Sequence, residues 1–321
     1  MVATPTLLAA EADRSVLNGN GTGKTAQQDL VPPPMSRRSV TRSTNAPPGE
    51  SILLGDQGVP FTLFIPPTWP GAVTNGSTLT AHFHSAAWFP IQEHLRHGSA
   101  SPLVCFQLGE GSGVYRKAFL DTNRFSRVLR LVEHELKRRS ATASARISRV
   151  DVSSFSAGYG AVRELIKSPE YFSLIQRIVL LDSMYASYDA AAADVPSSSP
   201  REKGQTSGRP APEHIAPWVP FARAAMLGQK SFVFTHSAVP TAQYANSAAC
   251  ATALVAAVGA TSHSVAPNSL PAASDPDFPL RARCDAGRFH VWSYAGDDAQ
   301  AHITHVQHMA DVWLALDRRS P

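Results

Sequence analysis

The most constraining feature of this sequence is a central segment that reads as a strand, a tight turn and a helix. Alternating apolar residues run from Val150 to Phe155 and stop at Ser156, which has small residues around it. Apolar residues then recur three and four positions apart, at Val162, Leu165 and Ile166. This layout predicts a nucleophile elbow, the strained turn that lifts a serine hydroxyl out of the backbone.

The segment departs from the usual elbow pattern in one position. That pattern is Gly-x-Ser-x-Gly, because small neighbours let the helix pack closely on the strand. Here Ser154 replaces the first glycine and Gly158 keeps the second. An ordinary strand, loop and helix with a serine in the turn is the alternative, so the surrounding sequence has to decide.

The rest of the chain alternates strand-like and helix-like segments. Helical spacing of apolar residues predicts one helix around residues 125–136 and a last helix around residues 306–313. The expected strands are Phe61–Ile65, Leu79–Phe83, Leu103–Leu108, Ile147–Phe155, Ile178–Leu181, Phe232–Phe234 and Phe289–Tyr294. Such alternation predicts an α/β fold with a mostly parallel central sheet and helices on both faces.

Four of these strands end in residues capable of chemistry, and in such sheets ligands bind at the carboxyl ends of the strands. They end at His82-Phe83-His84-Ser85, at Ser156, at Asp182-Ser183, and at a Gly296-Asp297-Asp298 loop that leads to His302. The resulting order along the chain is serine, aspartate, histidine. This is the order of the catalytic triad in one known fold.

On these residues, the chain resembles the α/β-hydrolase superfamily over roughly residues 50–317. Three runs, Phe83–Trp88, Gly111–Tyr115 and Leu181–Tyr185, are similar to a little-characterised bacterial group within it. The resemblance implies a serine esterase or lipase-like activity on a small-molecule or polymeric ester, without a cofactor. It does not identify the acyl group or the alcohol.

A serine hydroxyl needs a neighbouring imidazole to take its proton and a carboxylate to orient that imidazole. Ser156 is the expected nucleophile. His302 and His305 compete for the base: on a helical wheel His302 lies nearest the inward face, His305 lies about 60° away, and His308 points mostly to solvent. Asp182 is the expected acid, with Asp297 and Asp298 as the fallback.

The reaction also needs backbone amides that stabilise the developing oxyanion. The amide of Ala157, the residue after the nucleophile, is one expected donor. The second is expected after the strand that ends at His84, in a loop where related enzymes often carry His-Gly. The chain has His84-Ser85-Ala86 there, so the amide of Ser85 or Ala86 is the candidate.

Two other functions remain open. His82 and His84 lie on the same side of a strand, a geometry that suits zinc, so metal-dependent hydrolysis is an alternative. A protein that keeps the fold for binding without catalysis is another, because a fold does not dictate a function. No further metal ligand has a tight sequence spacing.

Apolar residues are spread from residue 51 onward, which predicts one catalytic domain over residues 49–321. Residues 1–48 are rich in Ser, Thr, Asn, Pro and Gly and lack periodicity, which predicts a flexible N-terminal arm. Residues 186–222 contain a second low-complexity stretch after the strand that ends at Asp182. A lid over the site and a plain surface loop are both consistent with that stretch.

The formal net charge of +4 is modest, and its two clusters, Arg37-Arg38 and Lys137-Arg138-Arg139, lie in a tail and at a helix end, which gives no reason to expect nucleic-acid binding. No apolar run approaches the ~18 residues of a membrane span, and no convincing signal peptide is present. The expected location is cytoplasmic, or exported after removal of a leader. Cys105 reads as a buried strand residue, whereas Cys250 and Cys284 could pair or remain free thiols.

Overall fold

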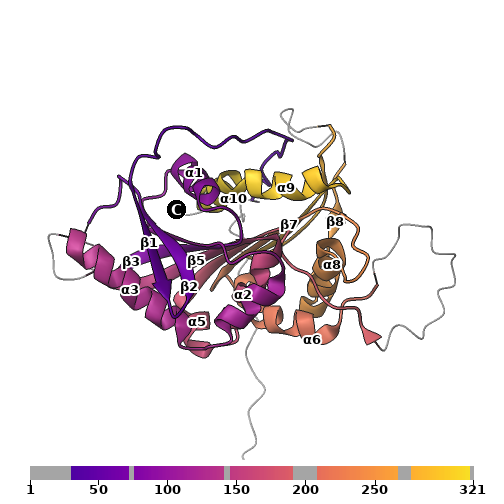
Figure 1. The fold of residues 1–321 in the computed structure, drawn as a ribbon. Coiled ribbons are helices and arrows are strands. Elements are labelled where there is room, and N and C mark those ends of the chain that lie inside the picture. Colours follow the sequence, from indigo (N-terminus) through magenta and orange to yellow (C-terminus); the bar gives the residue numbers. More distant parts are fainter. Residues whose placement is uncertain (1–29, 72–75, 141–144, 191–207, 267–275, 319–321) are drawn as a thin grey trace, which may run out of the picture.

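The computed structural model describes residues 30–71, 76–140, 145–190, 208–266 and 276–318. Its centre is a ten-stranded sheet in the order β1-β2-β4-β3-β5-β6-β7-β10-β9-β8 (Figure 1). The strands are β1 (Glu50–Asp56), β2 (Val59–Ile65), β3 (Ser77–Phe83), β4 (Leu103–Phe106), β5 (Ile147–Phe155), β6 (Ile175–Leu181), β7 (Ser231–His236), β8 (His263–Ser264), β9 (Leu280–Ala286) and β10 (Phe289–Tyr294).

The six central strands, from β4 to β10, pair in parallel, and antiparallel pairs close both edges. Helices α1, α9 and α10 lie above the sheet in Figure 1, and α2, α3, α5, α6 and α8 lie below it. The helices are α1 (Trp88–His97), α2 (Ser112–Phe119), α3 (Arg124–Arg139), α4 (Tyr159–Leu165), α5 (Pro169–Leu174), α6 (Pro212–Ile215), α7 (Val219–Met226), α8 (Ser247–Val258), α9 (Ala299–Gln307) and α10 (Met309–Asp317). The expected fold class, a mostly parallel sheet covered on both faces, is confirmed.

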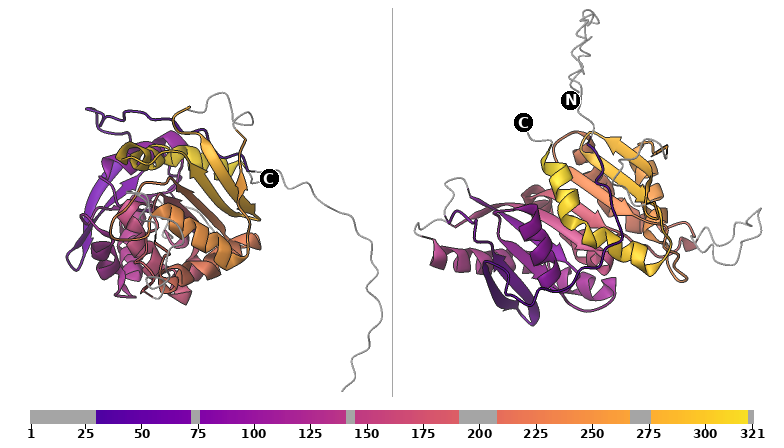
Figure 2. Two further views of the ribbon diagram at one scale, coloured as in Figure 1. Left: turned by 90° about the vertical axis from the view of Figure 1, so that its right-hand side faces the viewer. Right: turned by 90° about the horizontal axis from the view of Figure 1, so that it is seen from above.

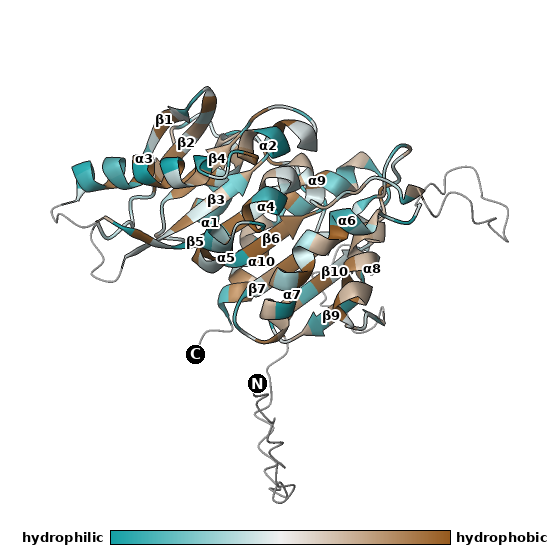
Figure 3. Cartoon of the chain, turned by 90° about the horizontal axis from the view of Figure 1, so that it is seen from below, coloured by the Kyte–Doolittle hydropathy of each residue, from teal (hydrophilic) through white to brown (hydrophobic). Residues whose placement is uncertain are grey.

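The strands are apolar because helices bury both faces of the sheet. Figure 3 shows brown on β6 and β7 beneath the helices and teal along the outer face of α3. Phe83 on β3 stacks on Phe106 on β4 with ring centroids 5.0 Å apart, and Phe119 on α2 closes over both rings edge-on. Among the described residues, no helix is long and apolar enough to cross a bilayer.

All seven expected strands are present, and the structure adds β1, β8 and β9 at the two edges of the sheet. The edge strands escaped detection because they are only partly buried. In β9, for example, only Cys284 is fully buried and the other side chains are partly or largely exposed. Strand-like alternation is weak in such a segment.

The segment before β1 differs from the expectation of a flexible arm over residues 1–48. Residues 1–29 lie outside the described residues, but residues 30–40 form a strap that packs along α9 and α10, visible in indigo in the view from above (Figure 2). Leu30 and Met35 are 2% and 1% exposed and join the cluster around Trp292 and Tyr294. The strap docks because a few of its apolar side chains complete that cluster. These residues have no periodic spacing in the sequence.

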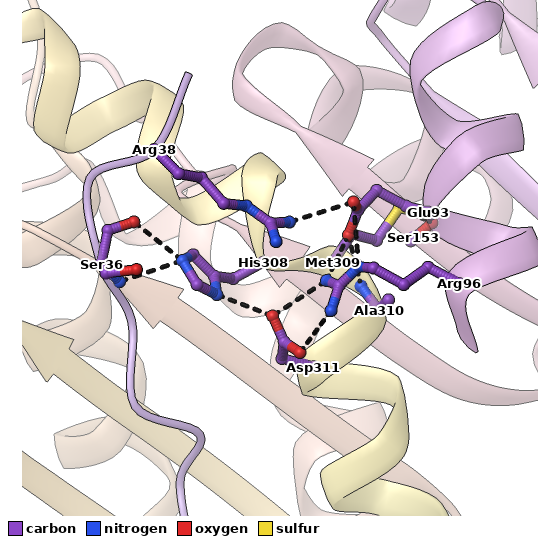
Figure 4. Close-up of polar contacts among 9 residues, drawn as sticks. All are labelled: Ser36, Arg38, Glu93, Arg96, Ser153, His308, Met309, Ala310 and Asp311. Carbon is purple, nitrogen blue, oxygen red and sulfur yellow. Dashed lines mark hydrogen bonds and ion pairs between the residues drawn. The ribbon is translucent and has the colours of Figure 1, made fainter. Parts of the chain in front are cut away.

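Polar contacts fix the strap beyond Met35 (Figure 4). The Ser36 amide donates to Nε2 of His308 (3.0 Å), and Nδ1 of His308 donates to Asp311 (2.7 Å). Arg38 pairs with the buried carboxylate of Glu93 on α1 at 3.0 Å. His308, which we expected to face solvent, is 5% exposed because the strap covers it and because the helix breaks there between α9 and α10.

The possible lid over residues 186–222 is described only at its two ends, because residues 191–207 lie outside the described residues. Its first residues bridge to Ala245, and its last residues form α6 and the start of α7. Trp218 and Phe221 are fully buried in the main core. Cys105, Cys250 and Cys284 are all buried free thiols, so the pairing of Cys250 with Cys284 is not formed.

Candidate active site

A pocket of about 1170 Å3 opens at the carboxyl ends of the central strands. Its wall contains Ser156 after β5, His84 after β3 and His302 on α9. Helices α2, α4 and α6 and the segment around Tyr244 complete it. The chemistry-bearing ends of separate strands therefore meet at one hollow, as parallel topology requires.

Ser156 occupies the strained turn that the sequence predicts. Its φ is +47°, in the left-handed region that non-glycine residues rarely adopt. The turn is held tightly against β3: a Cβ at Gly158 would lie 2.1 Å from the carbonyl oxygen of Phe83. Only glycine fits at position 158, so the second glycine of the motif has a steric reason here.

The departure at the first motif position also has a structural explanation. Ser154 is fully buried, and its hydroxyl lies 2.8 Å from the hydroxyl of Ser183, which follows β6. Ser183 in turn donates to the carbonyl oxygen of Ser156 at 2.8 Å. The hydroxyl of Ser154 is thus satisfied, and the pair of serines ties the strained turn to the neighbouring strand.

The structure brings Asp182 and His302 together. Nδ1 of His302 donates to Oδ2 of Asp182 at 2.6 Å. Asp182 is 1% exposed, has a φ of +43°, and its amide donates to the carbonyl oxygen of Thr235 on β7 at 2.7 Å. Burial opposes ionisation of this carboxyl, but the hydrogen bond from His302 holds its pKa below the ordinary value.

The imidazole of His302 stacks on the ring of Phe155, with centroids 4.5 Å apart. His84 stacks on the same ring at 5.9 Å, so Phe155 separates the two histidines. His302 and Ser156 line the same pocket, but no hydrogen bond joins them in the described residues. Catalytic hydrogen bonds in free enzymes are often long and tighten when substrate binds.

His305 does not reach this pocket. It is fully buried, and its Nδ1 lies 3.0 Å from the hydroxyl of Thr235. Burial lowers the pKa of His305 to about 3, so it is neutral at physiological pH. Asp298 serves as the N-cap of α9, accepting from the amide of Ala301 at 2.7 Å.

The loop after β3 lies beside the nucleophile. The His84 amide is used inside the fold, donating to the carbonyl oxygen of Phe106 at 2.9 Å. Among the described residues, no hydrogen bond occupies the amides of Ser85, Ala86 or Ala157. Ala157 lines the pocket at the start of the helical turn after Ser156, where backbone amides lack helical partners.

His82 and His84 do not form the metal-binding pair that their spacing suggested. His82 is fully buried, with Nδ1 2.8 Å from the hydroxyl of Ser153 and Nε2 3.1 Å from the hydroxyl of Ser85. Nδ1 of His84 instead meets the hydroxyl of Tyr115 at 3.0 Å. Within the described ranges, no group of three His, Cys, Asp or Glu side chains could hold a metal ion.

Several pocket residues escaped the sequence analysis. Tyr185 lies three residues after Asp182 and places its hydroxyl 3.5 Å from Nδ1 of His302. Tyr159 and Arg163 project from α4 into the same pocket. A tyrosine and an arginine one helical turn apart directly after the elbow were the available signal, because residues four apart share one face of a helix.

Comparisons with known proteins give fold likenesses only. No family model matches the chain, and no curated protein matches it. An S-formylglutathione hydrolase from Agrobacterium tumefaciens is 12% identical, with 83% of this chain and 94% of that chain covered and a TM-score of 0.43. A carboxyl esterase from the fungus Tuber melanosporum is 11% identical, with 86% and 87% covered and a TM-score of 0.43.

A hormone-sensitive lipase from a metagenome library is 13% identical, with 86% of this chain and 88% of that chain covered and a TM-score of 0.39. These values are too low to carry an argument about activity. The fold rests instead on the chain's own strand order and on the serine turn after the fifth strand. By that arrangement, the chain has the α/β-hydrolase fold.

Proposed function

We propose that this protein is a serine hydrolase that cleaves a carboxylic ester or a related acyl bond. One observation carries the proposal. His302 is held by Asp182 at 2.6 Å and lines the same pocket as Ser156, whose φ of +47° is typical of a strained nucleophile turn. His302, rather than the buried His305, is therefore the proposed base.

In the first half-reaction, Oγ of Ser156 attacks the carbonyl carbon while Nε2 of His302 takes the hydroxyl proton. Asp182 keeps the proton on Nδ1 and stabilises the imidazolium. The amides of Ala157 and of Ser85 or Ala86 would hold the oxyanion, at about 3–4 kcal/mol per donor. The tetrahedral species then expels the alcohol oxygen, which receives the proton from His302, and an acyl-enzyme remains.

In the second half-reaction, water attacks the acyl-enzyme and gives its proton to His302. Collapse of this second tetrahedral species breaks the bond to Oγ, and His302 returns the proton to Ser156. The acid leaves and the free enzyme is restored. No metal or organic cofactor enters either step.

A fluorophosphonate probe tests the nucleophile directly. Wild-type protein is expected to be labelled at Ser156, and Ser156→Ala is expected to lose labelling and ester hydrolysis together. Ser112→Ala is the matched control, because Ser112 lines the same pocket from α2 and is expected to leave labelling intact. Labelling that survives in Ser156→Ala would overturn the serine mechanism.

The two alternatives give different results in the same experiment. A metal-dependent hydrolase would hydrolyse esters without probe labelling and would lose activity to a chelator. A binding protein without catalysis would show neither labelling nor hydrolysis. The proposed mechanism requires labelling and hydrolysis that a chelator leaves unchanged.

A further inference from the structure

Arg163 is a buried arginine in the wall of the pocket that contains Ser156. It belongs to α4, the helix that starts just after the elbow, and its side chain is 9% exposed. Its guanidinium lies over the ring of Tyr159, one helical turn earlier, 5.6 Å from the ring centroid. Arg163 and Tyr159 therefore form one continuous surface that leads away from the nucleophile.

The protein gives this guanidinium little to bind. Nε of Arg163 is buried without a hydrogen-bond partner in the described part of the chain. The ion pair that it makes there is with the adjacent Glu164, at 3.9 Å, too long for a hydrogen bond. A buried arginine is costly unless acceptors compensate its five N–H donors, so this side chain favours an anionic ligand.

Glu164 cannot neutralise the group, because two other cations share it. Nζ of Lys167 lies 2.8 Å from its carboxylate and Nε of Arg116 lies 3.4 Å from it. Two further carboxylates, on Glu110 and Glu213, line the pocket but are exposed to solvent. The charged side chains that line the pocket are thus three cations, on Arg116, Arg163 and Lys167, and two carboxylates. Arg163 is the buried one among them, where screening by water is weakest.

The wall between the nucleophile and Arg163 is aromatic. Phe155 is the last residue of β5, directly before Ser156, and Tyr159 and Tyr185 lie with their ring centroids 5.8 Å apart in the same pocket. The hydroxyl of Tyr159 is already used, donating to Ser112 at 3.0 Å. Such a wall suits an apolar spacer between a reacting ester at Ser156 and a charged group at Arg163.

We propose that the substrate carries a free carboxylate, separated from the scissile ester by an apolar spacer, and that Arg163 binds this carboxylate. The planar fork of arginine matches a carboxylate with two parallel hydrogen bonds. This inference rests on the proposed serine hydrolase function and adds the class of ester on which the enzyme acts. It assigns Arg163 to substrate binding, distant from the bonds that change.

Two pairs of esters test the proposal. The first pair places the charge on the acyl side: the 4-nitrophenyl monoester of adipic acid, and the same compound with its free carboxyl methylated. The second places it on the alcohol side: the acetate ester of 3-(4-hydroxyphenyl)propanoate, and its methyl ester. The charged member of one pair is expected to be preferred in kcat/KM by about 10- to 100-fold.

Substitutions at the arginine identify the residue responsible. In Arg163→Met, which suits a buried site, the preference is expected to fall to about one. Arg163→Lys keeps the charge without the fork, and an intermediate ratio is expected; it also tests the proposal if the methionine variant fails to fold. Lys117→Gln, on α2, is the matched control, because it removes one exposed cation outside the pocket lining and leaves the partners of Glu164 in place; its ratio is expected to stay within twofold of wild type.

A binding readout does not depend on turnover. Monomethyl adipate is expected to slow fluorophosphonate labelling of wild-type protein and to lose this effect in Arg163→Met. Equal kcat/KM values within both ester pairs, or a preference that survives in Arg163→Met, would overturn the carboxylate proposal. If Ser156 were still labelled in that case, the proposed serine hydrolase function would stand. Loss of labelling in wild-type protein would instead remove the hydrolase function itself.

Discussion

The two ends of the central strands differ in backbone strain and in how their charged groups are paired. At the carboxyl ends, three non-glycine residues have positive φ: His84, Ser156 and Asp182. Five of the twelve buried side-chain polar atoms without partners in the described structure also lie in this region. They are Oδ1 of Asp182, Nδ1 of His236, Oγ of Ser237, Oγ of Ser247 and Nε2 of His305.

At the amino ends, charged groups lie in a smaller pocket of about 550 Å3 and pair with one another. Asp151 is 1% exposed and accepts from Nη2 of Arg177 at 2.6 Å. Arg177 also pairs with Asp317 and lies over the ring of Trp313, 4.9 Å from its centroid. Backbone strain costs free energy, so the three strained non-glycine residues at the carboxyl ends mark that end as the candidate functional one.

The largest expected effect separates the two ends by activity. Asp182→Asn is expected to lower kcat by about 10³- to 10⁴-fold, because an amide no longer holds the correct tautomer of His302. Asp151→Asn is the matched control: it should leave kcat within about threefold but cost about 2–3 kcal/mol of stability, since it leaves Arg177 with one carboxylate fewer. Steady-state kinetics and urea unfolding measure both. A kcat loss in Asp151→Asn as large as that in Asp182→Asn would break the comparison.

The second expected effect is a loss of stability in mild acid. Burial lowers the pKa of His82 and of His305 to about 3, below the ordinary value of 6.5. Below pH 6.5 these histidines therefore bind protons in the unfolded chain but not in the folded one. The free energy of unfolding then falls by about 1.4 kcal/mol per pH unit for each histidine. His94, near the amino ends, adds a third such group, with a pKa of about 4.

One amino-end carboxylate, on Asp317, acts in a lower pH range. The pKa of Asp317 is held down by His97 and Arg177 against its burial, so its contribution is present above about pH 4 and is lost below it. The histidine effect is tested by measuring the free energy of unfolding in urea between pH 7.5 and 5. The slope of this free energy against pH is expected to be smaller in His305→Gln than in wild type, by the equivalent of about one bound proton. A slope unchanged by that substitution would show that His305 is protonated in the folded protein.

The smallest expected effect is a steric contrast within the carboxyl end. Gly158→Ala places a methyl group against the carbonyl of Phe83 and should destabilise the protein by about 1–3 kcal/mol while displacing Ser156. Gly113→Ala, in α2, meets no atom within 4 Å and should stabilise the helix by up to about 1 kcal/mol. Thermal unfolding measures both. Equal melting temperatures would mean that the turn relaxes away from β3.

The parts of this molecule that the sequence predicted are those built from periodic patterns and strand ends. The parallel strands and the pairing of Asp182 with His302 follow from topology, since parallel strands gather their carboxyl ends. The strap at residues 30–40 has no such pattern, because single side chains such as Met35 join a hydrophobic cluster formed mainly by residues much later in the chain. Arg163 could be placed on the elbow helix, but its burial without a partner depends on tertiary packing.

The strap has a consequence for the order in which the chain can fold. Ser36 meets His308, and Pro33 accepts from the hydroxyl of Tyr294, across separations of 272 and 261 residues. During synthesis these partners leave the ribosome long after the strap itself, so the strap waits undocked until β10, α9 and α10 exist. Contacts between residues far apart in the chain form late, because closing a long loop costs more conformational entropy than closing a short one. The strap can therefore dock only after α9, the helix that carries His302, has formed.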